Sequence, residues 1–196
     1  VNLLANAAVV NGALDLDGTG DRAVLDFPNG WEGANKVDIS IDLRFDDPGS
    51  LGNSRILYED NAFGIIASGN SMVIMVQTTT GSQHLWSGNL PFHDLQWHTI
   101  DVSIDTLTKQ VTADVDGQNV PTRNNIDLVL PSELANIDIG GAHWGDEVSG
   151  QIDNISITPS ANTTIQSAIG NADPTVALNT TGVPKWDMYS QAMFID

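Results

Sequence analysis

Cysteine is absent from this sequence of 196 residues. The fold therefore depends on no disulfide, and both a thiolate metal site and a thiol nucleophile are excluded. Small extracellular animal domains usually carry disulfides, whereas a larger bacterial exoprotein has a core big enough to fold without them. We therefore expect a secreted, extracellular protein of bacterial origin.

Long hydrophobic runs are missing as well. No stretch of about 18 apolar residues occurs, so no segment is expected to cross a membrane. The apolar start, residues 1–10, lacks a charged leading region and is interpreted as a first strand rather than as an intact signal peptide. Apolar residues still make up 41% of the chain, which is enough for a packed core.

Basic residues are scarce, with 7 Lys and Arg against 25 Asp and Glu and a formal net charge of −18. Such a field repels phosphates and anionic lipid, so nucleic acid is not an expected partner. Two compatible interpretations of the acidity stay open. Carboxylates in Gly- and Asn-rich turns suit Ca²⁺, which prefers oxygen ligands, and an acidic surface keeps a secreted or saline-adapted protein soluble.

Short alternating runs separated by turn signals recur along the chain. In residues 37–45, Val, Ile, Ile, Leu and Phe alternate with Asp, Ser, Asp and Arg, a period of two that predicts a half-buried strand. Residues 97–104 and 110–115 alternate in the same way, and the second run ends in the hairpin signal Asp116-Gly117. This spacing predicts an all-β, antiparallel two-sheet sandwich.

Three motifs occur in a characteristic order. Residues 13–24 hold a strand that ends in Asp-Gly and is followed by a further Asp. A Trp-His strand at Trp97-His98 precedes the strand that ends at Asp116-Gly117. Ile139-Gly140-Gly141 then leads, after a loop, to the Gly-x-Ile-Asp-x-Ile run of residues 150–155. In order and spacing, these motifs resemble the laminin-G-like branch of the concanavalin A-like jelly rolls.

The resemblance implies two antiparallel sheets packed face to face, one of them concave, over residues 1–159. It also implies that Trp97 packs in the core. Residues 160–196 are not explained by the resemblance. We interpret them as a C-terminal appendage or linker that either docks on the sandwich or leads into another domain of a longer chain.

A structural calcium ion is implied by the same resemblance. Members of this fold often hold Ca²⁺ where the early Asp-Gly turn meets the last strand, which here corresponds to Asp17, Gly18, Asp21 and Asp153. Carboxylates and the carbonyls of a Gly-rich turn supply suitable oxygen ligands. In the alternative interpretation, Asp17 and Asp21 cap turns and Asp153 faces solvent.

Several loops combine an aromatic ring with polar side chains, as sugar-binding rims do. The ring stacks on the sugar, and Asp, Asn, Glu or His accepts hydrogen bonds from its hydroxyls. One such group is at His143, Trp144 and Asp146, and a second is at His84 and Trp86, whereas Glu59 and Asp60 form an acidic group without a ring. The acidic group and the group at Trp144 also fit a solvated loop. The candidate ligand-binding residues are His143, Trp144, Asp146, His84, Trp86, Glu59 and Asp60.

Motifs for bond-breaking sites are missing from the sequence. The Glu-x-Asp-x-x-Glu strand of retaining glucanases does not occur, nor does a Gly-x-Ser-x-Gly elbow or a phosphate-binding loop with Lys. Gln96-Trp97-His98 superficially fits a lyase motif, but 7 basic residues provide no cationic cleft for a polyuronate. No catalytic residue is therefore predicted.

These observations favour a non-catalytic carbohydrate-binding or adhesion module of a larger secreted protein. Its expected partners are a glycan or cell-surface polysaccharide and the other domains of a longer chain. The alternative is a structural or protein-interaction domain of a calcium-dependent adhesin or exoprotein. A polysaccharide hydrolase or lyase with unrecognised residues is the third interpretation.

Overall fold

A computed structural model describes residues 1–26, 31, 34–46, 52–59, 63–87, 90, 92, 94–130, 136–142 and 146–160. These residues form strands, turns and loops, with no helix among them. The strands are β1 (Asn2–Leu4), β2 (Ala8–Val10), β3 (Ala13–Asp17), β4 (Arg22–Asp26), β5 (Lys36–Phe45), β6 (Asn53–Glu59), β7 (Phe63–Ser68), β8 (Ser71–Thr78), β9 (Gly81–Ser87), β10 (His98–Asp105), β11 (Gln110–Val115), β12 (Gln118–Asn124), β13 (Asn136–Ile139) and β14 (Ser149–Ser160). Nothing in these ranges is a helix of the length and hydrophobicity needed to span a bilayer.

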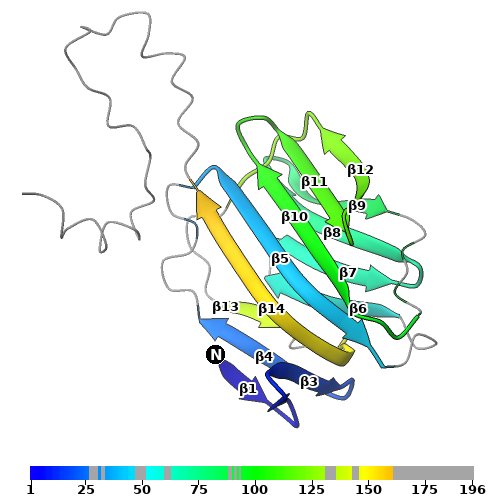
Figure 1. Ribbon diagram of the computed structural model, residues 1–196. Helices are drawn as coiled ribbons and strands as arrows, with labels where there is room; N and C mark the ends of the chain where they lie inside the picture. Colours follow the sequence, from blue (N-terminus) through cyan, green and yellow to red (C-terminus); the bar gives the residue numbers. More distant parts are fainter. Residues whose placement is uncertain are drawn as a thin grey trace, which may run out of the picture.

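The strands form two antiparallel sheets of seven strands each, which lie face to face (Figure 1). The order β12-β11-β10-β5-β14-β3-β2 makes one sheet, called here the β5 sheet. The order β1-β4-β13-β6-β7-β8-β9 makes the other, called here the β7 sheet. The predicted all-β, antiparallel two-sheet sandwich is thereby confirmed.

Strand β5 shows how the sequence pattern produces this sandwich. Its residues are buried and half-buried in strict alternation from Lys36 to Phe45. Val37, Ile41 and Leu43 are fully buried between the sheets, while the polar residues between them point outward, because successive side chains alternate across a strand. Ten consecutive residues thus supply part of the core on one face and a continuous polar surface on the other.

The β7 sheet is more deeply buried. In β7 and β8, runs of five consecutive residues are buried, so both faces of these strands are covered. On the inner face, the rings of Trp31 and Phe63 pack with their centroids 4.8 Å apart. The outer face is partly covered by Tyr58, whose ring lies against Gly64 and whose hydroxyl contacts the sulfur of Met75 at 3.8 Å.

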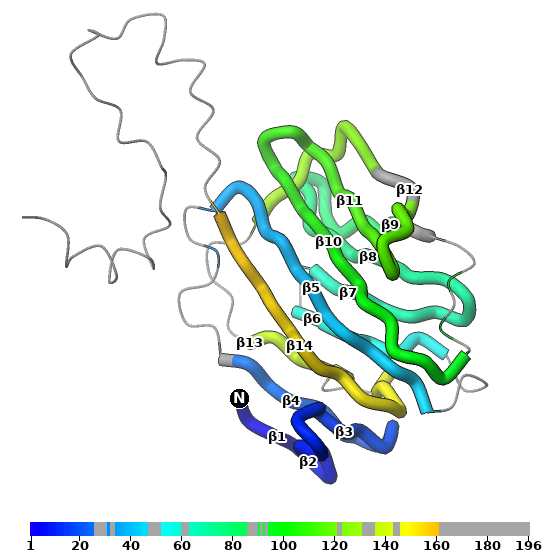
Figure 2. The backbone as a smooth tube through the Cα atoms, in the orientation of Figure 1, coloured from blue at the N-terminus to red at the C-terminus, as the bar shows by residue number. Residues whose placement is uncertain are grey.

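The two ends of the described chain lie on different strands of the sandwich (Figure 2). The apolar segment over residues 1–10 forms β1 and β2, which are edge strands of the β7 sheet and the β5 sheet. At the other end, β14 finishes at Ser160 beside Lys36 of β5. The predicted appendage over residues 160–196 lies outside the described residues except for Ser160, so it stays a prediction.

Candidate functional site

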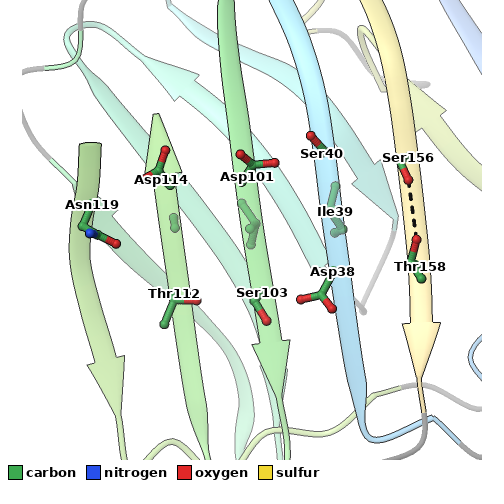
Figure 3. A pocket seen from close by; sticks show the side chains of 12 residues that line it. Asp38, Ile39, Ser40, Asp101, Ser103, Thr112, Asp114, Asn119, Ser156 and Thr158 are labelled. Carbon is green, nitrogen blue, oxygen red and sulfur yellow. Dashed lines mark hydrogen bonds between the residues drawn. The ribbon is translucent and has the colours of Figure 1, made fainter. Parts of the chain in front are cut away.

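Two rows of polar side chains cross the outward face of the β5 sheet, one from β14 to β12 and the other from β14 to β11 (Figure 3). They are aligned by register, since Ser40 on β5 pairs with both Ser156 on β14 and Asp101 on β10. Asp101 in turn pairs with Asp114 on β11. The first row is Ser156, Ser40, Asp101, Asp114 and Asn119, and the second is Thr158, Asp38, Ser103 and Thr112.

These nine residues line a hollow of about 290 Å³, called here the polar groove. The hollow exists because the outward side chains are short, so the surface lies close to the strand backbones. Its lining offers hydroxyls, carboxylates and one amide from five neighbouring strands. Such a surface forms many hydrogen bonds with a polyhydroxylated ligand and offers little apolar area to other ligands.

The polar groove is negatively charged at its centre. Asp101 is exposed and lies directly opposite Asp114, an arrangement of like charges that weakens a strand pair. Asp114 accepts the backbone N–H of Gly117 at 2.6 Å, and Asp38 accepts the ammonium of Lys36 at 2.8 Å. For Asp101, the described part of the chain provides neither a hydrogen bond nor an ion pair. Its carboxylate is therefore open to a ligand.

A hydrogen-bonded group holds the three central strands together beside the groove. Asp42 on β5 accepts the Thr99 hydroxyl of β10 at 2.7 Å and the Asn154 side-chain amide of β14 at 2.7 Å. Asn154 lies at an irregularity in the β14–β5 pairing and has a positive φ of 48°. The bond to Asp42 thus stabilises the bulge and fixes this edge of the groove.

Trp97 was expected in the core, and this prediction is wrong. Its side chain is 42% exposed, and it follows the same alternation as Thr99 and Asp101, which point outward from β10. The guanidinium of Arg44, on the outward side of β5, lies 5.7 Å from the centre of the Trp97 ring. Sequence reasoning therefore missed an exposed aromatic residue on the same outward face as the polar groove, about 13 Å along the chain from Asp101.

His98, the neighbour of Trp97, points inward and is 5% exposed. Its Nδ1 contacts Asp116 Oδ2 at 2.7 Å and its Nε2 contacts Asp94 Oδ1 at 2.9 Å. Burial of the ring opposes protonation, but the hydrogen bonds and charges of Asp116 and Asp94 outweigh it and raise the pKa of His98 above 6.5. We call Asp94, His98 and Asp116 the carboxylate clamp.

The residues predicted to bind calcium are brought together only in part. Gly18 lies against Ser149 of β14, so the early turn does meet the last strand. Asp21 is buried, and its two oxygens accept the backbone N–H groups of Asn6 at 2.7 Å and Asp17 at 2.9 Å. The Thr19 backbone N–H donates to the carboxylate of Asp17 at 2.8 Å. These bonds are of the turn-capping type that was considered as the alternative.

Asp153 lies apart from this turn. Asp17 pairs with Ser149, which precedes Asp153 by four residues on β14, a separation of about 13 Å along the strand. Asp153 accepts the backbone N–H of Asn154 and pairs in register with Asp42. Within the described ranges, no three His, Asp or Glu side chains are grouped to hold a metal ion. Calcium binding stays a prediction.

Among the predicted sugar-binding residues, the structure describes the side chains of Asp146, His84 and Glu59. Asp146 is ion-paired with Arg55 at 3.0 Å. His84 is exposed on β9 and Glu59 ends β6, and because β7 and β8 lie between these strands, the two residues are about 14 Å apart or more. The Trp86 side chain lies outside the described part, as do His143, Trp144 and Asp60.

The family model of the laminin G domain matches residues 59–160, which is more than half of the 196 residues. The chain belongs to the laminin G domain family. The family resemblance seen in the sequence motifs is thereby confirmed. Among curated protein sequences, none matches this laminin G domain.

Solved structures share its jelly-roll fold at low sequence identity. The mouse laminin alpha1 chain, domains LG4-5, is 16% identical with a TM-score of 0.58, and the match covers 74% of this chain and 40% of that one. The binding domain of botulinum neurotoxin DC in complex with SialylT is 11% identical with a TM-score of 0.60, covering 80% and 40%. The CBM40 of the Ruminococcus gnavus IT-sialidase is 11% identical with a TM-score of 0.53, covering 68% and 88%. This laminin G domain thus spans less than half the length of the first two chains.

Proposed function

We propose that this laminin G domain is a non-catalytic glycan-binding module of a larger secreted protein, and that the polar groove is its ligand site. The observation that carries the proposal is the pair of aligned polar rows, which offer hydroxyl, amide and carboxylate groups from five strands around one hollow. Two similar structures, the sialidase CBM40 and the neurotoxin domain bound to SialylT, support a carbohydrate ligand.

A glycoside hydrolase is the second candidate, because Asp101 and Asp114 are directly opposed on neighbouring strands. Hydrolysis needs one carboxylic acid that keeps its proton near neutral pH, usually in an apolar pocket. Asp101 is exposed, and Asp114 is bonded to the Gly117 backbone N–H, so neither lies in such a pocket. We therefore expect no release of reducing sugar from any glycan that binds.

The proposal is tested by filling the groove. Ser103→Tyr places a ring in the hollow, and an outward strand position tolerates an aromatic residue. We expect the wild type to bind at least one glycan on a glycan array and the variant to lose that binding, with circular dichroism and melting temperature unchanged. Ser82→Tyr is the matched control, because Ser82 is an exposed strand residue of the β7 sheet.

Two results would contradict the proposal. An array on which the wild type binds nothing would leave the protein-interaction role as the better account. Equal glycan binding by Ser103→Tyr and wild type would show that the ligand lies elsewhere.

A further inference from the structure

The outward face of β10 continues past the polar groove to an exposed aromatic ring. Trp97, Thr99, Asp101 and Ser103 alternate with residues buried in the core, so they lie on one side of the chain. From Trp97 to Ser103 the backbone extends about 20 Å. Arg44 covers one part of the Trp97 ring, and the side chain is still 42% exposed, so ring area remains open to a ligand.

We propose that Trp97 is an aromatic subsite at the end of the polar groove, an inference that rests on the proposed function. A terminal sugar ring of an uncharged oligosaccharide stacks on the Trp97 ring. The carboxylate clamp holds the loop of this subsite in place. The ligand is elongated because its polar contacts and its stacking contact lie along one strand. It is uncharged because Asp101 and Asp114 accept hydroxyl hydrogens and repel acidic sugars.

The loop that carries Trp97 is strained and is held by specific bonds. Leu95 has a positive φ of 62°, which is unfavourable for a branched side chain, and it is 49% exposed. Asp94 accepts the backbone N–H of Gln96 at 2.8 Å while it contacts His98. Strain of this kind persists where surrounding bonds fix the conformation, and it is frequent at ligand-binding sites.

The clamp connects this loop to the β11–β12 turn. Asp116 accepts the backbone N–H of Thr99 at 2.9 Å and donates its own N–H to the Thr99 carbonyl at 3.0 Å. The His98 and Phe92 rings pack edge to face, with centroids 5.8 Å apart. Among the described residues, the titratable groups that contact His98 are Asp94 and Asp116. The position of the Trp97 loop therefore depends on the charge of His98.

Protonation decides how many bonds the clamp makes. Both ring nitrogens face a carboxylate oxygen, and only the imidazolium donates a hydrogen from each of them. When His98 loses its proton, one of the two bonds is lost and the loop is held from one side. Binding of long oligosaccharides therefore weakens as the pH rises through the pKa of His98.

The test uses oligosaccharides of about two to six sugar units, which bracket the span of about 20 Å from Trp97 to Ser103. They come from the cello-, manno-, xylo- and N-acetylchito-oligosaccharide series. Affinities are measured by calorimetry on the full chain. For the wild type we expect affinity to rise with length in at least one series. Trp97→Ala is expected to lower the affinity for the longest oligosaccharide roughly three- to tenfold. Trp97→Phe is expected to restore part of that affinity. Leu107→Ala is the matched control, an exposed apolar residue of the β10–β11 turn.

Charge and pH provide two further readouts. Sialyllactose is expected to bind more weakly than lactose, and stronger binding of the sialylated sugar would overturn the uncharged ligand class. Asp94→Asn alters an exposed carboxylate and lowers the pKa of His98, so the pH midpoint of long-chain binding moves to lower pH. An unchanged midpoint would show that the clamp does not position the subsite.

The outcomes separate this inference from the proposed function. If no oligosaccharide of these series and neither lactose nor sialyllactose binds the wild type, both fail. If the wild type binds an oligosaccharide and Ser103→Tyr abolishes that binding while Trp97→Ala changes nothing, the polar groove is the ligand site and the aromatic subsite is refuted.

Discussion

His98 joins three segments of the fold through one ring. It contacts Asp94 in the loop before β10, Asp116 in the β11–β12 turn, and the ring of Phe92. Neutral imidazole has one N–H, so only one of these two carboxylates would keep a hydrogen bond from the ring. The charged form of His98 therefore makes one more hydrogen bond than the neutral form, and folding favours it.

We expect His98→Gln to destabilise the domain by about 1–2 kcal/mol at about pH 6 and by less at about pH 9. The pKa of His98 is raised above its ordinary 6.5 in the folded state, so its stabilisation is complete below 6.5 and is lost as the pH rises through the folded value. Urea unfolding of wild type and variant at both pH values measures the difference. His84→Gln, on an exposed histidine, is the control and should show no such trend. A difference that is the same at both pH values would contradict the clamp.

The position of Trp97 could be predicted from the sequence, but only from its local pattern. Thr99, Asp101 and Ser103 are polar and share its alternation, whereas His98 and Ile100 are buried. The family resemblance pointed to the core and gave the wrong answer. The clamp was not foreseeable, because Asp116 follows His98 by 18 residues and reaches it only through the β10–β11 pairing.

Strand β14 lies between β5 and β3 in the β5 sheet, and at Gly150 its backbone closely approaches that of β5. At Gly150, φ is +156°, and an added Cβ would collide with the carbonyl oxygen of Arg44 and approach the Cα of Phe45 within 2.9 Å. Backbone atoms of a central strand cannot move aside as a flexible side chain does. This close approach explains why the Gly-x-Ile-Asp-x-Ile run of residues 150–155 begins with Gly.

Gly150→Ala is expected to destabilise the domain by about 2 kcal/mol or more, since it combines overpacking with an unfavourable φ. Urea unfolding measures the loss. The control is Gly69→Ala, where φ is +55° but no atom lies within 4 Å of the added Cβ, so only the backbone strain of about 1–2 kcal/mol remains. Equal losses for the two variants would mean that the close approach to β5 is not limiting.

Single strands were easier to predict than the surface they form together. The alternation of residues 37–45 identified β5 and its two faces, because period two is a local property. The polar groove depends on which residues become neighbours across strands. Ser40 meets Asp101 and Ser156, which follow it by about 60 and 116 residues, and no local pattern encodes that register.

The net charge of −18 acts on the whole molecule. Mutual repulsion among the carboxylates disfavours the compact state, and dissolved salt screens it. The described ion pairs of Lys36, Arg44 and Lys109 are partly exposed and contribute little. Any cation that binds only the folded chain would stabilise it beyond simple screening.

Calcium is predicted to raise the melting temperature above that in EDTA, with Asp17 and Asp21 as its remaining adjacent candidate ligands. Differential scanning fluorimetry in millimolar CaCl₂ measures the effect, and NaCl of equal ionic strength is the control for screening. A melting temperature that matches the NaCl control would remove the metal from the account of this fold.

Ser156 and Thr158 on β14 form one wall of the polar groove, and β14 is also the last described strand. A mechanical load applied to the chain after residue 160 would therefore reach first this wall of the proposed sugar site. A ligand lying across the rows links β14 to β10 and β11, which resists peeling of that strand. Ligand binding in the proposed groove and load on the chain beyond residue 160 would therefore act on the same strand, β14.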